Sequence, residues 1–183
     1  MIKKMEKIMF LTWLSLFLIS GSTFSIAETD GPPVDLNKPV ENPQLKAAIA
    51  KYKEDSTTEN WSALEKSLNS AYYLVPIIAD TLKTQPTDES GKVVVQKGSI
   101  IQFMVYEDTN KSYLLPVCTD WDEIALFTKQ KVDTVVMRPS QLWDFVLGDK
   151  RQKGYQGVVV NPGSNKLELH VKDIAPLRKI AER

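Results

Sequence analysis

The sequence predicts a single α+β domain in which helices cover one mixed β-sheet. Apolar residues recur at helical spacing over residues 43–68, and from residue 71 onward short β-branched and aromatic runs alternate with helical segments. Two helices followed by strands with interleaved helices are typical of this class. The chain has 183 residues, and removal of a 27-residue leader would leave 183 − 27 = 156, enough for one domain with its own core. We place that domain at residues 42–183.

The N-terminus has the three-part pattern of an export signal. Three lysines lie within residues 1–7, and residues 8–19 form an uncharged apolar run. Small residues occupy the −3 and −1 positions of a cleavage site after Ala27. We therefore expect a signal peptide at residues 1–27, export to the periplasm or the extracellular space, and no stable membrane insertion after cleavage.

An uncleaved anchor is the alternative interpretation of the same segment. The apolar stretch continues through Ile26 and is then just long enough for a marginal transmembrane helix, whose lysines would stay on the cytoplasmic side. The domain would lie outside the cytoplasm in both cases. Residues 28–41 contain three prolines before position 40 and few large apolar groups, which predicts a flexible linker.

Two helices are expected at the start of the domain. Asn42 followed by Pro43 is a typical helix start, and the apolar spacing continues to about Lys53. Ser56 and Glu59 have the spacing of a capping box ahead of the second helix.

The remainder of the domain is predicted to alternate strands and helices. Strands are expected at residues 71–79, 99–106, 112–119, 132–137, 157–160 and 167–171, and helices at 120–129, 138–148 and 173–181. The polar turn 107–111 predicts that the strands on either side of it form an antiparallel hairpin. Residues 82–98 are mostly polar and are expected to be a loop or an irregular edge.

Composition excludes several classes of function. Lys+Arg and Asp+Glu each number 23, and without the leader the balance is 20 basic to 22 acidic residues, so no basic excess suggests nucleic-acid binding. One cysteine and one histidine rule out an internal disulfide and the usual structural zinc sites. Any metal site would have to depend on carboxylates, and the sequence predicts neither a metal nor a cofactor.

Four stretches, in order, resemble the N-terminal domain of the SseB (enhanced serine sensitivity) family. They are Asn42–Leu45, Leu74–Pro76, Tyr113–Asp120 and Gly157–Gly163. The resemblance implies an α/β fold and a small protein without an established enzymatic activity, and it supplies no catalytic residues to transfer. The family has an aromatic residue where this chain has Cys118, and it is mostly cytoplasmic, whereas this chain carries a leader.

These observations predict an exported, non-catalytic binding domain that docks a protein partner. The alternative is a thiol- or sulfur-handling enzyme that uses Cys118, for which His170 is the one candidate histidine base; a buried strand residue is the simpler interpretation of Cys118. Asp122 and Glu123 fit the acidic first turn of a helix without any catalytic role.

The candidate interaction surface combines two turns that each follow a strand: Thr119, Asp120 and Trp121, with Asn161, Pro162, Gly163 and Ser164. The second of these turns is also explained by backbone geometry alone.

Overall fold

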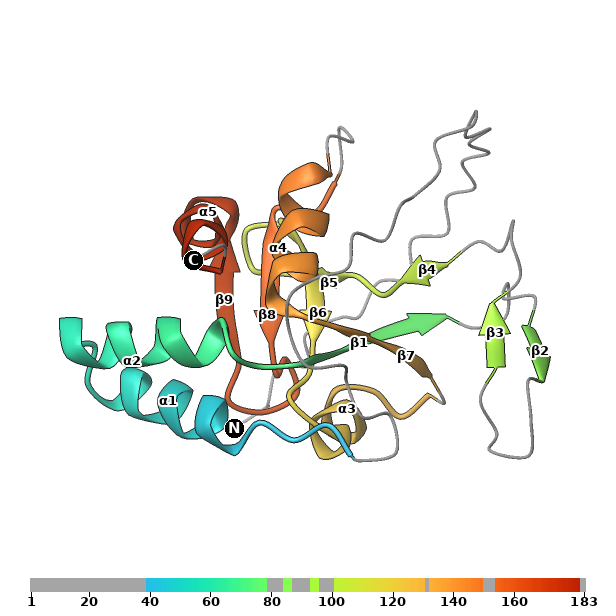
Figure 1. The fold of residues 1–183 in the computed structure, drawn as a ribbon, viewed down its shortest axis with the longest axis horizontal. Helices are drawn as coiled ribbons and strands as arrows, with labels where there is room; N and C mark the ends of the chain where they lie inside the picture. Colours follow the sequence, from blue (N-terminus) through green and yellow to red (C-terminus); the bar gives the residue numbers. More distant parts are fainter. Residues whose placement is uncertain are drawn as a thin grey trace.

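The computed structural model describes residues 39–78, 84–86, 93–95, 101–130, 132–149 and 154–181. The predicted signal peptide, residues 1–27, and residues 28–38 of the predicted linker lie outside the described residues. Within the described ranges the chain forms helices and strands in the order α1–α2–β1–β2–β3–β4–β5–β6–α3–β7–α4–β8–β9–α5 (Figure 1). This order and the packing around one main core confirm the α+β class and the single domain.

Helices α1 (Pro43–Glu54) and α2 (Thr58–Leu68) lie side by side at one end of the molecule (Figure 1). Helix α1 turns Leu45 and Ile49 into the core and α2 turns Leu64 and Leu68 into it, which confirms their predicted apolar faces. The predicted capping box at Ser56 is wrong by one residue, because Thr57 is the cap and its hydroxyl accepts from the N–H of Asn60. The Ser56 hydroxyl instead donates to the Tyr52 carbonyl of the preceding helix.

The strands of the described ranges form three sheets, where the sequence predicts one. The first has the order β4 (Gln102–Phe103), β1 (Tyr73–Ile78), β7 (Asp133–Met137), and all its pairs are antiparallel. The second has the order β5 (Tyr106–Glu107), β6 (Tyr113–Val117), β8 (Gly157–Val160), β9 (Leu167–His170), and it is mixed because β6 and β8 are parallel. The third is the hairpin of β2 (Thr84–Pro86) and β3 (Val93–Val95).

Two differences from the predicted strands have one cause. The sequence predicts a single strand over residues 99–106, of which 99–100 lie outside the described residues. Residues 102–103 pair with β1 as β4, whereas Tyr106 pairs with β6 as the start of β5. The predicted hairpin across residues 107–111 is therefore confirmed only at its closed end. The sequence predicts a loop or irregular edge over residues 82–98, and the described residues of this segment, 84–86 and 93–95, pair as the strands β2 and β3. A run of β-branched and aromatic residues predicts extended backbone, but it does not predict which neighbouring strand completes its hydrogen bonds.

A single bridge joins the two larger sheets. Leu74 and Cys118 exchange both backbone hydrogen bonds, with N···O distances of 2.9 and 2.8 Å. Side chains that alternate along β1 and β6 consequently face two cores. Tyr73, Val75 and Val117 enter the main core, whereas Leu74 and Cys118 enter a smaller one.

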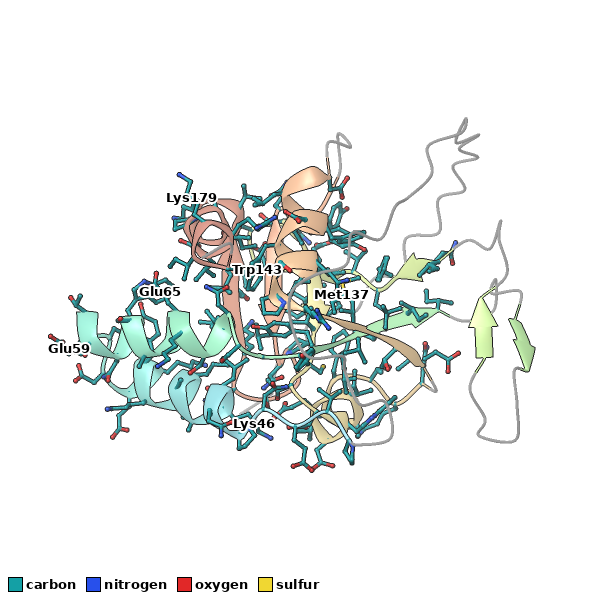
Figure 2. All side chains as sticks on the ribbon, viewed as in Figure 1. Lys46, Glu59, Glu65, Met137, Trp143 and Lys179 are labelled. Carbon is teal, nitrogen blue, oxygen red and sulfur yellow. The ribbon has the colours of Figure 1, made fainter. Side chains whose placement is uncertain are left out.

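Each core is closed by its own helices. The main core is covered by α1, α2, α4 (Pro139–Gly148) and α5 (Val171–Ile180), and Figure 2 shows Trp143 of α4 directed into it. Trp143 is fully buried, and its indole N–H donates to the Asn69 side chain at 2.9 Å. The smaller core is closed by α3 (Trp121–Phe127), through Ile124 and Phe127. No helix in the part of the chain that the structure describes is both long and apolar enough to cross a bilayer.

Candidate functional site

The two turns predicted to form an interaction surface lie next to each other. Strands β6 and β8 are parallel neighbours, with Val117 opposite Val160. The carboxyl ends of parallel neighbours meet at the same edge of a sheet. Residues 119–121 follow β6 and residues 161–164 follow β8, so all seven predicted residues gather at that edge.

Two of the seven residues are buried and form the connection between the turns. The N–H of Thr119 donates to Asn161 Oδ1 at 2.9 Å, and Asn161 Nδ2 donates to the Thr119 hydroxyl at 3.0 Å. Thr119 is 0% and Asn161 2% exposed, so neither can touch a partner directly. Asn161 has a φ of 51°, a left-handed conformation that asparagine tolerates better than most residues.

Asn42 attaches the start of α1 to the same edge. Its Nδ2 donates to the carbonyls of Thr119 and Tyr72, both at 2.7 Å, and its Oδ1 accepts from the Tyr72 N–H at 3.1 Å. Asn42 stands at the predicted N-cap position, but its side chain makes no capping hydrogen bond. The sequence predicts that Asn42 caps its own helix, but in the structure its side chain joins the start of α1 to the backbone of Tyr72 and Thr119.

An ion-paired cluster fixes the N-terminus of α3. Asp120 caps the helix by accepting from the Glu123 N–H at 3.0 Å, as its position before an acidic first turn indicates. Lys46 Nζ lies 3.0 Å from Asp120 Oδ2 and 3.4 Å from Glu123 Oε1. Figure 2 places Lys46 on the side of α1 that faces α3. The Ser164 hydroxyl donates to the other oxygen of the buried Glu123, which brings the second turn into the cluster.

The cluster sets the charge state of the Asp120 carboxyl. Partial burial pushes the pKa of Asp120 upward, but the N–H of Glu123 and the Lys46 ammonium group outweigh it. The pKa of Asp120 is therefore lowered from its ordinary value of 3.8. The hydrogen bond to Asp120 in turn raises the pKa of Lys46. Both groups are charged at neutral pH and hold α1 against α3.

The exposed part of the site is the outer face of α3. Trp121 is 49% and Leu126 55% exposed, and Asp122 and Ala125 lie between them on the same arc of the helix. Beside this arc lies Gly163: a Cβ atom there would stand 2.5 Å from the backbone of Leu126 and Phe127. The glycine is required by this close approach.

Cys118 lies beneath α3 and is inaccessible. It is 0% exposed, and burial, with smaller contributions from the nearby Glu123 and Asp120, raises the pKa of its thiol far above the ordinary value. A raised pKa keeps the sulfur protonated, whereas nucleophilic and redox cysteines need an accessible thiolate. The native geometry thus gives no observation in favour of the Cys118 enzyme hypothesis, and thiol labelling is its test.

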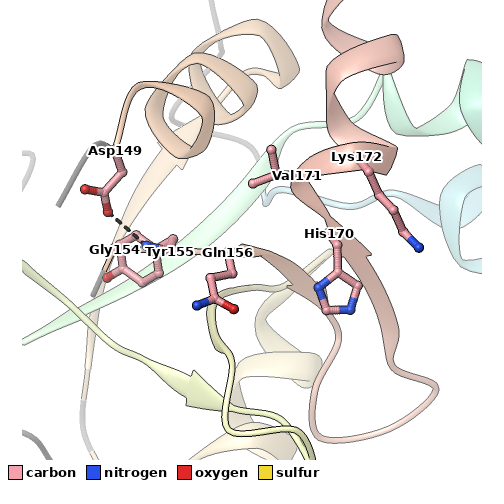
Figure 3. A pocket seen from close by; sticks show the side chains of 7 residues that line it. All are labelled: Asp149, Gly154, Tyr155, Gln156, His170, Val171 and Lys172. Carbon is pink, nitrogen blue, oxygen red and sulfur yellow. Dashed lines mark hydrogen bonds between the residues drawn. The ribbon is translucent and has the colours of Figure 1, made fainter. Parts of the chain in front are cut away.

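A shallow pocket of about 370 Å³ lies at the other end of β8, between the end of α4 and the start of α5. Figure 3 shows its lining residues: Asp149, Gly154, Tyr155, Gln156, His170, Val171 and Lys172. Asp149 Oδ2 accepts from the Tyr155 N–H at 2.9 Å, and this hydrogen bond holds the segment that re-enters β8. None of the seven residues of the predicted interaction surface lines this pocket.

The fold and this site define a small α+β domain with a hydrogen-bonded edge, two strand-end turns and a helix face that exposes Trp121 and Leu126. Residues 45–175 match the model of the SseB protein N-terminal domain, which is more than half of the chain. The chain belongs to the SseB family, as the four ordered stretches indicated. No curated protein and no solved structure matches the chain.

Proposed function

We propose that this SseB domain is an exported, non-catalytic binding module whose docking surface for a protein partner is the exposed face of α3. The observation that carries the proposal is the exposure of Trp121 and Leu126, 49% and 55%, on one short helix. Large apolar side chains left on a monomer surface are common singly, but tryptophan is among the residue types enriched in the strongest contacts of protein interfaces. Asp122 adds a negative charge between them, which favours a partner that presents an apolar side chain beside a basic one.

The network of hydrogen bonds and ion pairs at the start of α3 supports the same function. Asp120 and Glu123 pair with Lys46, and Thr119 is hydrogen-bonded to Asn161, so the helix start is held both by α1 and by the turn after β8. A surface that is rigid before binding loses less conformational entropy on association. In this proposal the buried members of the predicted surface position Trp121 and do not contact the partner.

The test is capture of the partner with a matched pair of variants. In-cell crosslinking of the tagged full chain, followed by affinity capture and mass spectrometry, identifies the partner. The Trp121→Ala/Leu126→Ala double variant is then compared with wild type for binding to the purified partner. Removal of a tryptophan at the centre of an interface costs about 2 kcal/mol or more, which is roughly a 30-fold loss of affinity.

The control removes exposed apolar groups from a distant part of the surface. Val171→Ala/Ile180→Ala changes two residues of α5 that are 41% and 43% exposed and should leave binding unchanged. Equal binding by the α3 double variant, with its circular dichroism spectrum intact, would refute the docking surface. Loss of binding in both double variants would indicate a broader surface.

Export is the second part of the proposal, supported by the three-part leader pattern of residues 1–27. Mass measurement of the protein from the producing cells tests it. We expect a mature N-terminus at Glu28 in the periplasmic or extracellular fraction. A chain that retains its leader and sediments with membranes would support the anchored alternative, and a soluble chain that retains it in the cytoplasm would refute export.

A further inference from the structure

Strand β9 presents two potential metal ligands on one side. Side chains alternate along a strand, and Leu167 and Leu169 face the main core. Glu168 and His170 therefore share the opposite face, where they are directly paired with Val159 and Gly157 of β8. Glycine at the position opposite His170 leaves the imidazole free of a cross-strand side chain.

The β5–β6 turn carries a carboxylate to this face. Asp108 Oδ1 accepts from the N–H groups of Asn110 and Ser112, both at 2.8 Å, and these bonds fix the carboxylate within the turn. The turn is held over β9, because Lys166 Nζ donates to the Tyr106 hydroxyl at 2.7 Å. Each of the three residues Asp108, Glu168 and His170 offers a ligand atom, and these atoms lie within 4.8 Å of one another.

The second oxygen of Asp108 is the observation that points to a ligand. Asp108 is 5% exposed, and among the described residues no donor forms a hydrogen bond with its Oδ2. A buried carboxylate oxygen without a partner is costly, and such groups are rare in native proteins unless water or an ion satisfies them. Asp108, which carries this unpartnered oxygen, is also the third member of the cluster with Glu168 and His170.

We propose that Asp108, Glu168 and His170 bind a divalent transition-metal cation, with Zn²⁺ as the probe of choice. Two carboxylate oxygens and one imidazole nitrogen form a donor set suited to Zn²⁺ and less suited to Ca²⁺ or Mg²⁺, which prefer all-oxygen sites. Ligand distances of about 2.0–2.2 Å in a tetrahedral zinc site place the donor atoms roughly 3.3–3.6 Å apart. Donor atoms that lie within 4.8 Å of one another must therefore approach by at most about 1.5 Å, which side-chain rotation can supply. His170 also lines the pocket of Figure 3, which gives the site a route to solvent.

Charge at the site is compatible with a divalent ion. Lys166 Nζ lies 3.2 Å from Glu168 Oε1, so its positive charge offsets one of the two carboxylates. A carboxylate has two oxygens, and an ion pair through one leaves the other able to coordinate a cation. With neutral imidazole the three ligands and Lys166 sum to −1, and a divalent cation changes this sum to +1.

The test is calorimetric titration of chelator-treated full chain with Zn²⁺, followed by thermal unfolding with and without the metal. We expect one Zn²⁺ per chain and, at about 100 times the Kd, a rise in Tm of roughly 5–10 °C. Asp108→Asn keeps the oxygen that accepts from the turn N–H groups but replaces Oδ2 with an amide. His170→Gln removes the imidazole and keeps its backbone N–H, which donates to Asp173.

Each of these two variants should weaken Zn²⁺ binding by at least about 100-fold, beyond the effect of losing an outer-shell partner. Glu54→Gln, which changes an exposed carboxylate at the end of α1, is the control and should bind like wild type. Absence of Zn²⁺ binding by wild type, or equal binding by Asp108→Asn and His170→Gln, would overturn the proposal. Because the partner-binding test uses α3 and this test uses the β9 face, either proposal can fail without the other.

Discussion

Asn42 offers the sharpest test of how the domain edge is held together. Its side chain makes three hydrogen bonds with the backbone of Tyr72 and Thr119 and none with its own helix. A typical hydrogen bond contributes about 1 kcal/mol net, and an unsatisfied buried group costs about 1–3 kcal/mol. Asn42→Ala should therefore lower the free energy of unfolding by about 3 kcal/mol, a large part of the total for one domain.

A second substitution separates the tertiary role from helix capping. Aspartate is as good an N-cap residue as asparagine, so Asn42→Asp would be nearly neutral if the side chain served α1 alone. Aspartate cannot donate to the two carbonyls that Asn42 Nδ2 contacts. We therefore expect Asn42→Asp to be at least as destabilising as Asn42→Ala.

Urea unfolding followed by circular dichroism measures these differences. Asn110→Ala is the control, because Asn110 is exposed and hydrogen-bonds to Asp108 through its backbone N–H; it should stay within about 0.5 kcal/mol of wild type. An Asn42→Asp variant as stable as wild type would refute the tertiary role. If Asn42→Ala lowers the free energy of unfolding by less than about 0.5 kcal/mol, the contribution assigned to the three hydrogen bonds is refuted.

Three further predictions concern α3 and its surroundings. Cys118 should react with a thiol reagent only after denaturant is added, because it is buried and its pKa is raised; rapid labelling of native protein, scored by mass, would revive the thiol-enzyme hypothesis. Gly163→Ala should destabilise the domain by more than about 2 kcal/mol in urea unfolding, since its Cβ would stand 2.5 Å from the α3 backbone, whereas Gly148→Ala, which meets nothing within 4 Å, should not. Because the pKa of Asp120 is lowered from 3.8, ionised Asp120 contributes stability that is fully present above this value and is lost as the pH falls below it. The stability difference between wild type and Asp120→Asn should therefore shrink in unfolding curves measured below about pH 4, and a difference that is constant with pH would contradict the ion pair with Lys46.

The candidate surface was predictable in part because its residues have local signals. Asp120 precedes an acidic first turn, and Asn161 begins an Asn-Pro-Gly turn, so short-range capping and turn chemistry place both at strand ends. Their proximity required only the expectation that the two strands end at one edge. Which of them would be buried could not be predicted, because exposure depends on the chain that packs over each turn.

The cluster of Asp108, Glu168 and His170 has no comparable capping or turn signal in the sequence. Asp108 is 60 residues from Glu168, and only the spacing of Glu168 and His170 on one strand face hinted at a shared site. The contact arises because the β5–β6 turn is held over β9, a placement that depends on Lys166 and Tyr106. The split of the run 99–106 between two sheets has the same origin, since strand partners are chosen by the whole domain.

By itself, the sequence determined the class of the fold, the family, most helix starts and the turns, because periodicity, capping and backbone preference act over a few residues. The tertiary structure decided how the strands were divided among sheets, the burial of Cys118, the attachment of Asn42 to Thr119 and the meeting of Asp108 with His170. Asn42 and Thr119 lie 77 positions apart in the sequence, and Thr119 and Asn161 lie 42 apart. Contacts at such separations depend on the path of the whole chain, and no local energy term encodes them.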